Sequence, residues 1–152
     1  MANKAPSKTA ERILQSAQEL FNRFGVPNVS TTLIANEVGI STGNLYYHFP
    51  AKDELIDTLL ARHETRMNQH LGDLQQRPHS LDHLMDFVRA RLALVWDFRF
   101  LYRDLNDLIS RNRRLETHFQ DLVTVQIERL TQVLRHLADA NTLTLPSALI
   151  GP

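Results

Sequence analysis

The sequence has no cysteine, only five glycines in 152 residues, and no long apolar run. The absence of cysteine excludes disulfides, thiolate zinc sites and cysteine nucleophiles. No run of about 18 apolar residues is present, and the N-terminal MANKAPSKTAER lacks a hydrophobic signal segment. We therefore expect a cytoplasmic protein without a membrane segment. Few glycines and no period-two apolar alternation indicate an all-helical chain.

Neither sign of charge is in excess, since 17 Lys and Arg balance 17 Asp and Glu. Residues 1–60 hold five basic against six acidic side chains. No global positive field therefore points to nucleic acid, and any DNA contact must come from local placement of side chains. An apolar share of 43% and a charged share of 22% are typical of a globular protein of one domain, or of two small units sharing a core.

The first third of the chain predicts three short helices separated by turns. Apolar spacing from Ala10 to Phe24 favours an amphipathic helix that Gly25 ends as a C-cap. Pro27 should prevent a new helix until Ser30, which caps the second helix, and Gly39 ends that helix. A third helix is expected from a Ser41 cap to Pro50. This arrangement matches a helix-turn-helix unit. The inner face of the second helix should be Ile34, Ala35 and Val38.

The rest of the chain predicts longer helices. One runs from about Ala51 to a break at QQRPHS, residues 75–80, and the next from Ser80 to about Asp97. The second of these has apolar positions on two sides, which predicts a central helix packed on more than one neighbour. A helix around residues 101–109 and a last long helix after Leu115 follow. We expect an all-α fold, with a helix-turn-helix domain at 1–54 and a helical ligand-binding and dimerisation domain at 55–152.

The stretch GISTGNLYYHFPAKDEL, residues 39–55, carries the chemistry of the third helix. Leu45 and Phe49 are four residues apart and should face inward. Hydroxyl, amide and imidazole groups on the outer face suit phosphate oxygens and base edges in the major groove of DNA. Gly43 lets the backbone approach a partner, Ser41 leaves helix N–H groups available to an anion, and Lys52 adds a positive charge. The outward residues are Thr42, Asn44, Tyr46, Tyr47 and His48. Alternatively, the tyrosines pack against the long helix and His48 faces solvent or the edge of the core.

The run ILQSAQELFNRFGVPNVSTTLIANEVGISTGNLYYHFPAKDEL, residues 13–55, resembles the DNA-binding region of the tetracycline-repressor (TetR) family. The matching features are Ile-Leu and Leu-Phe before Gly25, Ile34-Ala35, Gly39-Ile40-Ser41, Gly43, Leu45-Tyr46, His48-Phe49, and Lys52 three residues before Leu55. The resemblance implies base reading or approach by Thr42, Gly43, Asn44 and Tyr47. It implies phosphate contacts by Tyr46, His48 and Lys52, with Thr31 and Thr32 near the backbone. It further implies a ligand-responsive repressor that binds a palindromic operator in double-stranded DNA as a homodimer.

The family's second domain binds a small-molecule effector, and we expect its pocket wall along the long helix that ends near Asp97. The expected lining is Phe87, Arg91, Leu94, Phe98, Tyr102, Asn106, Phe119 and Gln126. Arg91 interrupts an apolar stripe, which is costly unless the charge is paired. It either anchors an anionic ligand or pairs internally with an acid such as Asp86, Asp104 or Asp107. Trp96 and the phenylalanines are core candidates rather than a cofactor site.

Other classes of function find little support in the sequence. His79 and His83 have a spacing that can place two imidazoles on one helix face, but no third ligand is evident, so no metal or cofactor is expected. No phosphate loop, nucleophile turn or isolated carboxylate pair indicates an enzyme. A helical protein-interaction module remains the alternative. Family members usually have two more C-terminal helices, so the chain is expected to be truncated or to dimerise differently, through the apolar stripe Leu122, Leu130, Val133 and Leu137.

Overall fold

The structure, a computed structural model, describes residues 7–76, 80–111 and 113–139, and every regular element in these ranges is helical. The prediction of an all-α chain is therefore confirmed. The chain divides into two compact units. The first holds the described residues up to Arg62 together with Asp97–Leu108, and the second holds His63–Trp96 and the described residues from Ile109 onward. A boundary at residue 54 assigns Asp97–Leu108 to the C-terminal domain, whereas this segment packs with the N-terminal helices.

The first unit begins with α1 (Lys8–Phe24), which Ser7 caps by accepting the N–H of Ala10 at 3.2 Å. Gly25, with φ of 88°, ends this helix as predicted. The 3₁₀ turn η1 (Val26–Asn28) follows, although no helix was expected around Pro27. That expectation was wrong because a proline in the first turn of a helix removes only an N–H that has no partner within the helix.

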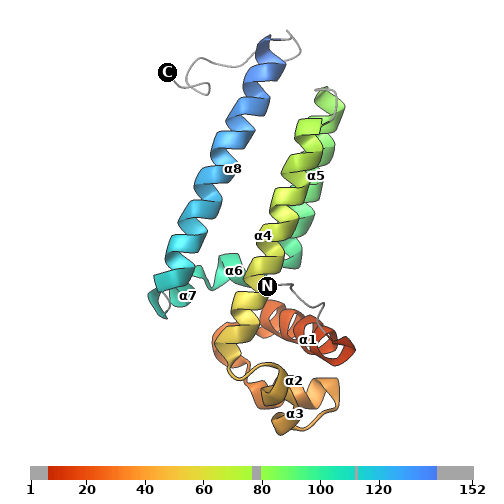
Figure 1. Cartoon of the computed structure of the whole chain (residues 1–152), viewed down its shortest axis with the longest axis vertical. Helices are drawn as coiled ribbons and strands as arrows, with labels where there is room; N and C mark the ends of the chain where they lie inside the picture. The colour runs from red at the N-terminus through yellow and green to blue at the C-terminus, as the bar shows by residue number, and fades with distance from the viewer. Residues whose placement is uncertain (1–6, 77–79, 112, 140–152) are drawn as a thin grey trace. The chain divides into compact units, whose positions relative to one another are not determined.

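The helix-turn-helix consists of α2 (Thr31–Val38) and α3 (Thr42–His48), which Figure 1 shows beside α1. Ser30 and Ser41 act as the predicted caps, each accepting a backbone N–H three residues further on, at 3.1 and 3.2 Å. Gly39 lies in the left-handed region, with φ of 74° and ψ of 38°, and turns the chain between the two helices. A residue with a Cβ adopts this conformation only with strain, so the glycine fixes the turn.

These three helices and the start of α4 (Lys52–Gln76) all bury apolar side chains. Because the helices are short, most of their stability must come from this burial rather than from helix propensity. Arg12 of α1 adds a polar link, donating to the carbonyl of Val38 at 2.8 Å, where its positive charge suits the C-terminus of α2. The fully buried side chains of these helices include Ile13, Leu14, Phe21, Ile34, Leu45, Leu55 and Leu59.

The second unit consists of the later part of α4, together with α5 (Leu81–Asp97) and α8 (Arg113–Asp139), which run lengthwise in Figure 1. All three helices contribute to one apolar cluster. Its members are Leu71, Phe87 and Val133, with Leu84 and Leu130 packed against them. Ser80 caps α5 by accepting the N–H of His83 at 3.3 Å, as the sequence predicted. None of the helices in the described ranges is long and apolar enough to cross a membrane.

Three expectations about the later helices need correction. α5 is not packed on two sides, because only Phe87 and Leu94 of its own length are buried and its other apolar stripe is exposed. The helix expected around residues 101–109 is two helices, α6 (Arg99–Arg103) and α7 (Leu105–Arg111), separated at Asp104. Leu122 and Val133, which were expected at a dimer interface, are buried inside the second unit, while the side chain of Leu137 lies outside the described residues.

Candidate nucleic-acid interface

The outer face of α3 carries two exposed aromatic rings. Tyr47 is 84% exposed and Tyr46 is 47% exposed, while Leu45 and Phe49 point into the core as their spacing predicted. The alternative in which Tyr47 packs against the long helix is therefore excluded. A tyrosine this open gains nothing from burial in the chain, so the ring is available to a partner. Asn44 and Thr32 are also exposed, whereas Thr42 and His48 are half-buried.

Two contacts restrict the side chains of Tyr46 and Tyr47 on this face. The hydroxyls of Thr31, at the start of α2, and Tyr46 are hydrogen-bonded at 3.0 Å. The ring of His48 meets Tyr47 edge-on, with centroids 5.2 Å apart and planes at 80°. Such contacts restrict the rotamers of both tyrosines before any partner arrives, which lowers the entropy lost on binding.

Nothing among the residues that the structure describes accounts for a glycine at position 43. Its φ is not positive, and a Cβ built there would meet nothing closer than the Ser41 hydroxyl, at 3.9 Å. Glycine in a helix is less favourable than alanine by up to about 1 kcal/mol. A glycine at a site where alanine would fit and stabilise the helix is the expected choice where a partner approaches the backbone closely.

Lys52 lies at the start of α4, and the fold uses its ammonium. It donates to the carbonyl of Val26 at 2.9 Å and to that of Val29 at 3.1 Å. These bonds hold the exit of η1 against α4. Two of its three N–H groups are thus engaged within the first unit, a role that sequence reasoning missed because the acceptors are backbone atoms 23 and 26 residues away.

The second cluster of interest surrounds Arg91 on α5. Its guanidinium lies 4.8 Å from the ring centroid of Phe87, donates to Gln126 Oε1 at 2.5 Å, and contacts the sulfur of Met67. Gln126 in turn donates to Asn68 Oδ1 at 3.0 Å. The structure therefore brings together Phe87, Arg91 and Gln126 from the predicted pocket wall, and adds two residues of α4 that the sequence analysis left out.

His63 lies beside this cluster and is completely buried. Burial, and then the positive charge of Arg91, lower the pKa of His63 from 6.5 to about 4. The imidazole is therefore neutral at pH 7. The sequence could have indicated this burial. His63 lies four positions before Met67, so the two side chains share the inward face of α4.

The remaining residues of the predicted pocket lie in both units. Leu94 is buried and Phe119 is half-buried in the second unit, whereas Phe98, Tyr102 and Asn106 belong to the first. Two of the three acids proposed as partners of Arg91 have other contacts: Asp86 pairs with Arg89 at 3.2 Å, and Asp104 accepts the N–H of Val26.

The histidine pair considered as a metal site is only partly visible. His79 lies outside the described residues, and Nδ1 of His83 is 3.1 Å from the Ser80 hydroxyl. Within the part of the chain that the structure describes, no three His, Cys, Asp or Glu side chains lie close enough to share a metal ion.

These features define a helix-turn-helix protein in which the outer face of α3 is exposed and available to a partner. Two family models match the chain, "Bacterial regulatory proteins, tetR family" over residues 13–59 and "Bacterial transcriptional repressor", TetR, over residues 62–150. The chain belongs to the TetR family of bacterial transcriptional regulators, which confirms the resemblance carried by residues 13–55.

Individual relatives agree with this assignment. A TetR-family regulator from Marinobacter aquaeolei VT8 is 31% identical, with a TM-score of 0.87 over 94% of this chain and 71% of that one. The ketosteroid transcriptional regulator KstR2 of Mycobacterium tuberculosis has the same fold, at 20% identity and a TM-score of 0.75 over 88% of this chain and 70% of that one. An HTH-type transcriptional regulator of Staphylococcus aureus (strain USA300) is 33% identical over 100 residues, or 60% of this chain. The match spans 54% of that relative, so the chain covers about half the length of the curated relatives it matches.

Proposed function

We propose that this chain is a sequence-specific regulator that inserts α3 into the major groove of double-stranded DNA and binds an inverted repeat as a homodimer. The supporting observation is the outer face of α3, where Asn44 and Tyr47 are exposed and Gly43 leaves the backbone uncovered. This role would place the protein in the cytoplasm. No catalytic step, metal or cofactor is part of the proposal.

Side-chain chemistry divides the proposed contacts into two groups. Amide and hydroxyl groups near the start of α3 suit base edges, which carry sequence information. The groups at its edges suit phosphates, which set position and register. The base-reading group is Thr42, Gly43, Asn44 and Tyr47, and the phosphate group is Thr31, Thr32, Ser41, Tyr46, His48 and Lys52. Lys52 would use its third N–H, because the first two bind η1.

Selection of bound sequences from a random DNA pool tests this function. The wild type should enrich one inverted repeat, and Asn44→Ala should change the preferred base at the position it reads, at a cost of about 1–3 kcal/mol. Gln132→Ala, an exposed change on α8, should leave the motif unchanged. Failure to enrich any sequence would favour the helical protein-interaction module. An unchanged motif with Asn44→Ala would remove the base-reading role of that residue.

We further propose that the effector lies against the Arg91 cluster of the second unit. A guanidinium over an aromatic ring, beside a neutral amide oxygen, can turn its donors toward the carboxylate of an entering ligand. If Arg91 anchors an organic anion, Arg91→Met should melt near the wild-type temperature, bind operator and lose its response to the anion. If the arginine has only a structural role, its loss should lower the melting temperature and leave the response unchanged. Arg135→Met, an exposed change on α8, is the matched control.

A further inference from the structure

The orientation of α3 depends on α2, the helix that precedes it. The two helices are joined by the tight turn at Gly39, with φ of 74°, and by the bond between the hydroxyls of Thr31 and Tyr46 at 3.0 Å. α2 is only eight residues long, so its own backbone bonds do little to stabilise it. Contacts that hold the two ends of α2 therefore also set the angle at which α3 meets a partner.

The C-terminus of α2 needs partners for its last carbonyls, because the last turn of a helix has no intrahelical N–H groups for them. The turn that follows provides two such donors, the backbone N–H groups of Gly39 and Ile40. The carbonyl of Val38, the last residue of α2, accepts instead from Arg12 Nη2 of α1 at 2.8 Å. The guanidinium also places a positive charge at the negative end of the helix dipole.

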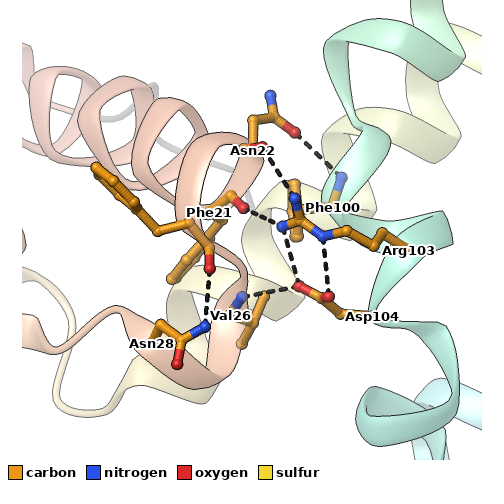
Figure 2. Close-up of polar contacts among 8 residues, drawn as sticks. Phe21, Asn22, Val26, Asn28, Phe100, Arg103 and Asp104 are labelled. Atoms are coloured by element: carbon orange, nitrogen blue, oxygen red, sulfur yellow. Dashed lines mark hydrogen bonds and ion pairs between the residues drawn. The ribbon is translucent and has the colours of Figure 1, made fainter.

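The chain leading into α2 is held by Lys52, the first residue of α4. Its ammonium donates to the carbonyls of Val26 at 2.9 Å and Val29 at 3.1 Å, and Val29 directly precedes the Ser30 cap of α2. The turn η1 is also held by Asp104, which accepts the N–H of Val26 at 2.8 Å, as Figure 2 shows. α2 therefore begins from a backbone segment whose position is fixed by two charged side chains.

The bonds of Arg12 and Lys52 both join a cation of a flanking helix to a backbone carbonyl far along the chain. Arg12 and Val38 are 26 positions apart, and Lys52 and Val29 are 23 positions apart. Hydrogen bonds from an ionised donor are shorter and stronger than bonds between neutral groups. Arg12 is exposed, and holding its long side chain in one geometry costs rotamer entropy that the bond must offset. The two ends of α2 are thereby tied to α1 and α4.

We propose that Arg12 and Lys52 are positioning residues that fix both ends of α2 and thereby set the angle of α3 in the major groove. This role rests on the proposed DNA binding. Hydrogen bonds to base edges require a narrow range of distance and angle, whereas attraction to phosphates falls off gradually with distance. A loosened α2 should therefore reduce discrimination between sequences more than it reduces affinity for DNA in general. Arg12 gives the cleaner test, because an N–H of Lys52 is also assigned to a phosphate.

Fluorescence anisotropy measures the affinity for the selected inverted repeat and for a scrambled duplex of the same length, at several salt concentrations. Arg12→Met should lower the ratio of the two affinities about tenfold, while the affinity for the scrambled duplex and the salt slope stay unchanged. Arg12→Lys keeps a donor for the Val38 carbonyl and should recover most of the ratio. Arg23→Met removes the same charge from the same helix, where the guanidinium lies 4.9 Å from the ring centroid of Phe24, and should match the wild type.

The outcomes separate the positioning role from the DNA binding on which it rests. If Arg12→Met weakens binding to both duplexes equally and reduces the salt slope by about one per subunit, Arg12 binds a phosphate and the positioning role is rejected. An unchanged ratio also rejects it, whatever the melting temperature, because a purely structural bond would alter stability alone. If the wild type does not prefer the selected repeat to the scrambled duplex, the proposed DNA binding itself fails. Should Arg12→Met show no cooperative thermal transition, Arg12→Gln replaces it, with the same expected results.

Discussion

Gly43 is a residue whose identity the fold does not require. It differs from Gly25 and Gly39, whose positive φ values make glycine the favoured residue for the turns they occupy. At Gly43 a methyl group would enter open space within the chain. The reason for glycine therefore lies outside the described molecule, and a substitution there can separate stability from binding.

We predict that Gly43→Ala leaves the free energy of unfolding unchanged or raises it by about 0.5 kcal/mol, because alanine favours the helix. The same change should weaken operator binding by about 1–3 kcal/mol, the usual cost of an added methyl group in a closely packed contact. Denaturant melts and anisotropy titrations measure the two quantities. Gly72→Ala, in open space on α4, is the matched control and should leave DNA affinity unchanged. Equal affinity of Gly43→Ala and wild type would show that no close approach occurs at this residue.

His63 should make the stability of the protein depend on acid pH. Below about pH 6.5 the unfolded chain binds a proton on this histidine, whereas the folded chain does not until about pH 4. The free energy of unfolding should therefore fall as pH drops from 6.5 to 4, with His63 contributing about 3 kcal/mol over this window. His63→Gln removes the titrating group, so the difference between variant and wild type should change with pH only inside the window. Parallel pH profiles for the two proteins would contradict the neutral buried imidazole.

At the scale of the element, α5 presents an apolar stripe that the described chain leaves open. Leu81, Met85, Val88 and Leu92 are exposed, with Leu92 at 65%, and follow a four-three-four spacing that places them on one seam. Trp96, which was expected in the core, is instead 68% exposed and extends the same side. Charges of opposite sign, Asp82 and Arg89, flank the seam, so two antiparallel copies of α5 would bring unlike charges together. A second copy of this chain is the occupant we expect, through a two-fold interface.

Leu92→Glu should convert the predicted dimer to a folded monomer at micromolar concentration, because this leucine is mostly exposed and its replacement leaves the core of the second unit intact. Ile127→Glu is the matched control, since Ile127 is similarly exposed but belongs to a different helix, α8. Light scattering after size-exclusion chromatography measures the mass. If Leu92→Glu stays dimeric while Ile127→Glu dissociates, the dimer uses α8 rather than α5.

At the scale of the whole molecule, charge is balanced and the basic residues near the candidate interface are used by the fold. Arg12 binds the carbonyl of Val38, Lys52 binds η1, and Arg62 pairs with Glu11 at 2.5 Å. DNA binding by this chain would thus depend on hydrogen bonds and helix placement more than on a positive field. Few counterions would be released when it binds.

We predict a shallow salt dependence of operator binding. With about two phosphates neutralised in each half-site, the slope of log K against log salt should be on the order of −4 for the dimer. Anisotropy titrations between about 50 and 200 mM salt measure it. A slope twice as steep would mean that basic side chains now engaged within the fold are released to the phosphates. The selected site should be an inverted repeat whose halves lie about 34–36 Å apart, the spacing of successive major grooves.

Local chemistry in the sequence was sufficient to predict the helix-turn-helix and the direction of its side chains. Ser30, Gly39 and Ser41 act on neighbours no more than five residues away, so their roles can be read from the sequence directly. The inward turn of Leu45 follows from helical period alone, and so does the exposure of Tyr47. The sequence by itself therefore determined the fold class, the end of α1 at Gly25, the caps of α2 and α3, and the candidate interface, whereas the start of α1 at Lys8 was placed two residues too late.

The tertiary structure alone decided how distant groups combine. Lys52 binds carbonyls 23 and 26 residues away, and Arg103 reaches carbonyls 81 and 82 residues away, distances at which no sequence period carries information. The packing partner of α5 was likewise hidden, because a helix with two apolar stripes does not indicate which one is covered within its own chain. Short-range order follows from bonds between near neighbours, whereas these contacts depend on how whole helices pack once their apolar faces are buried.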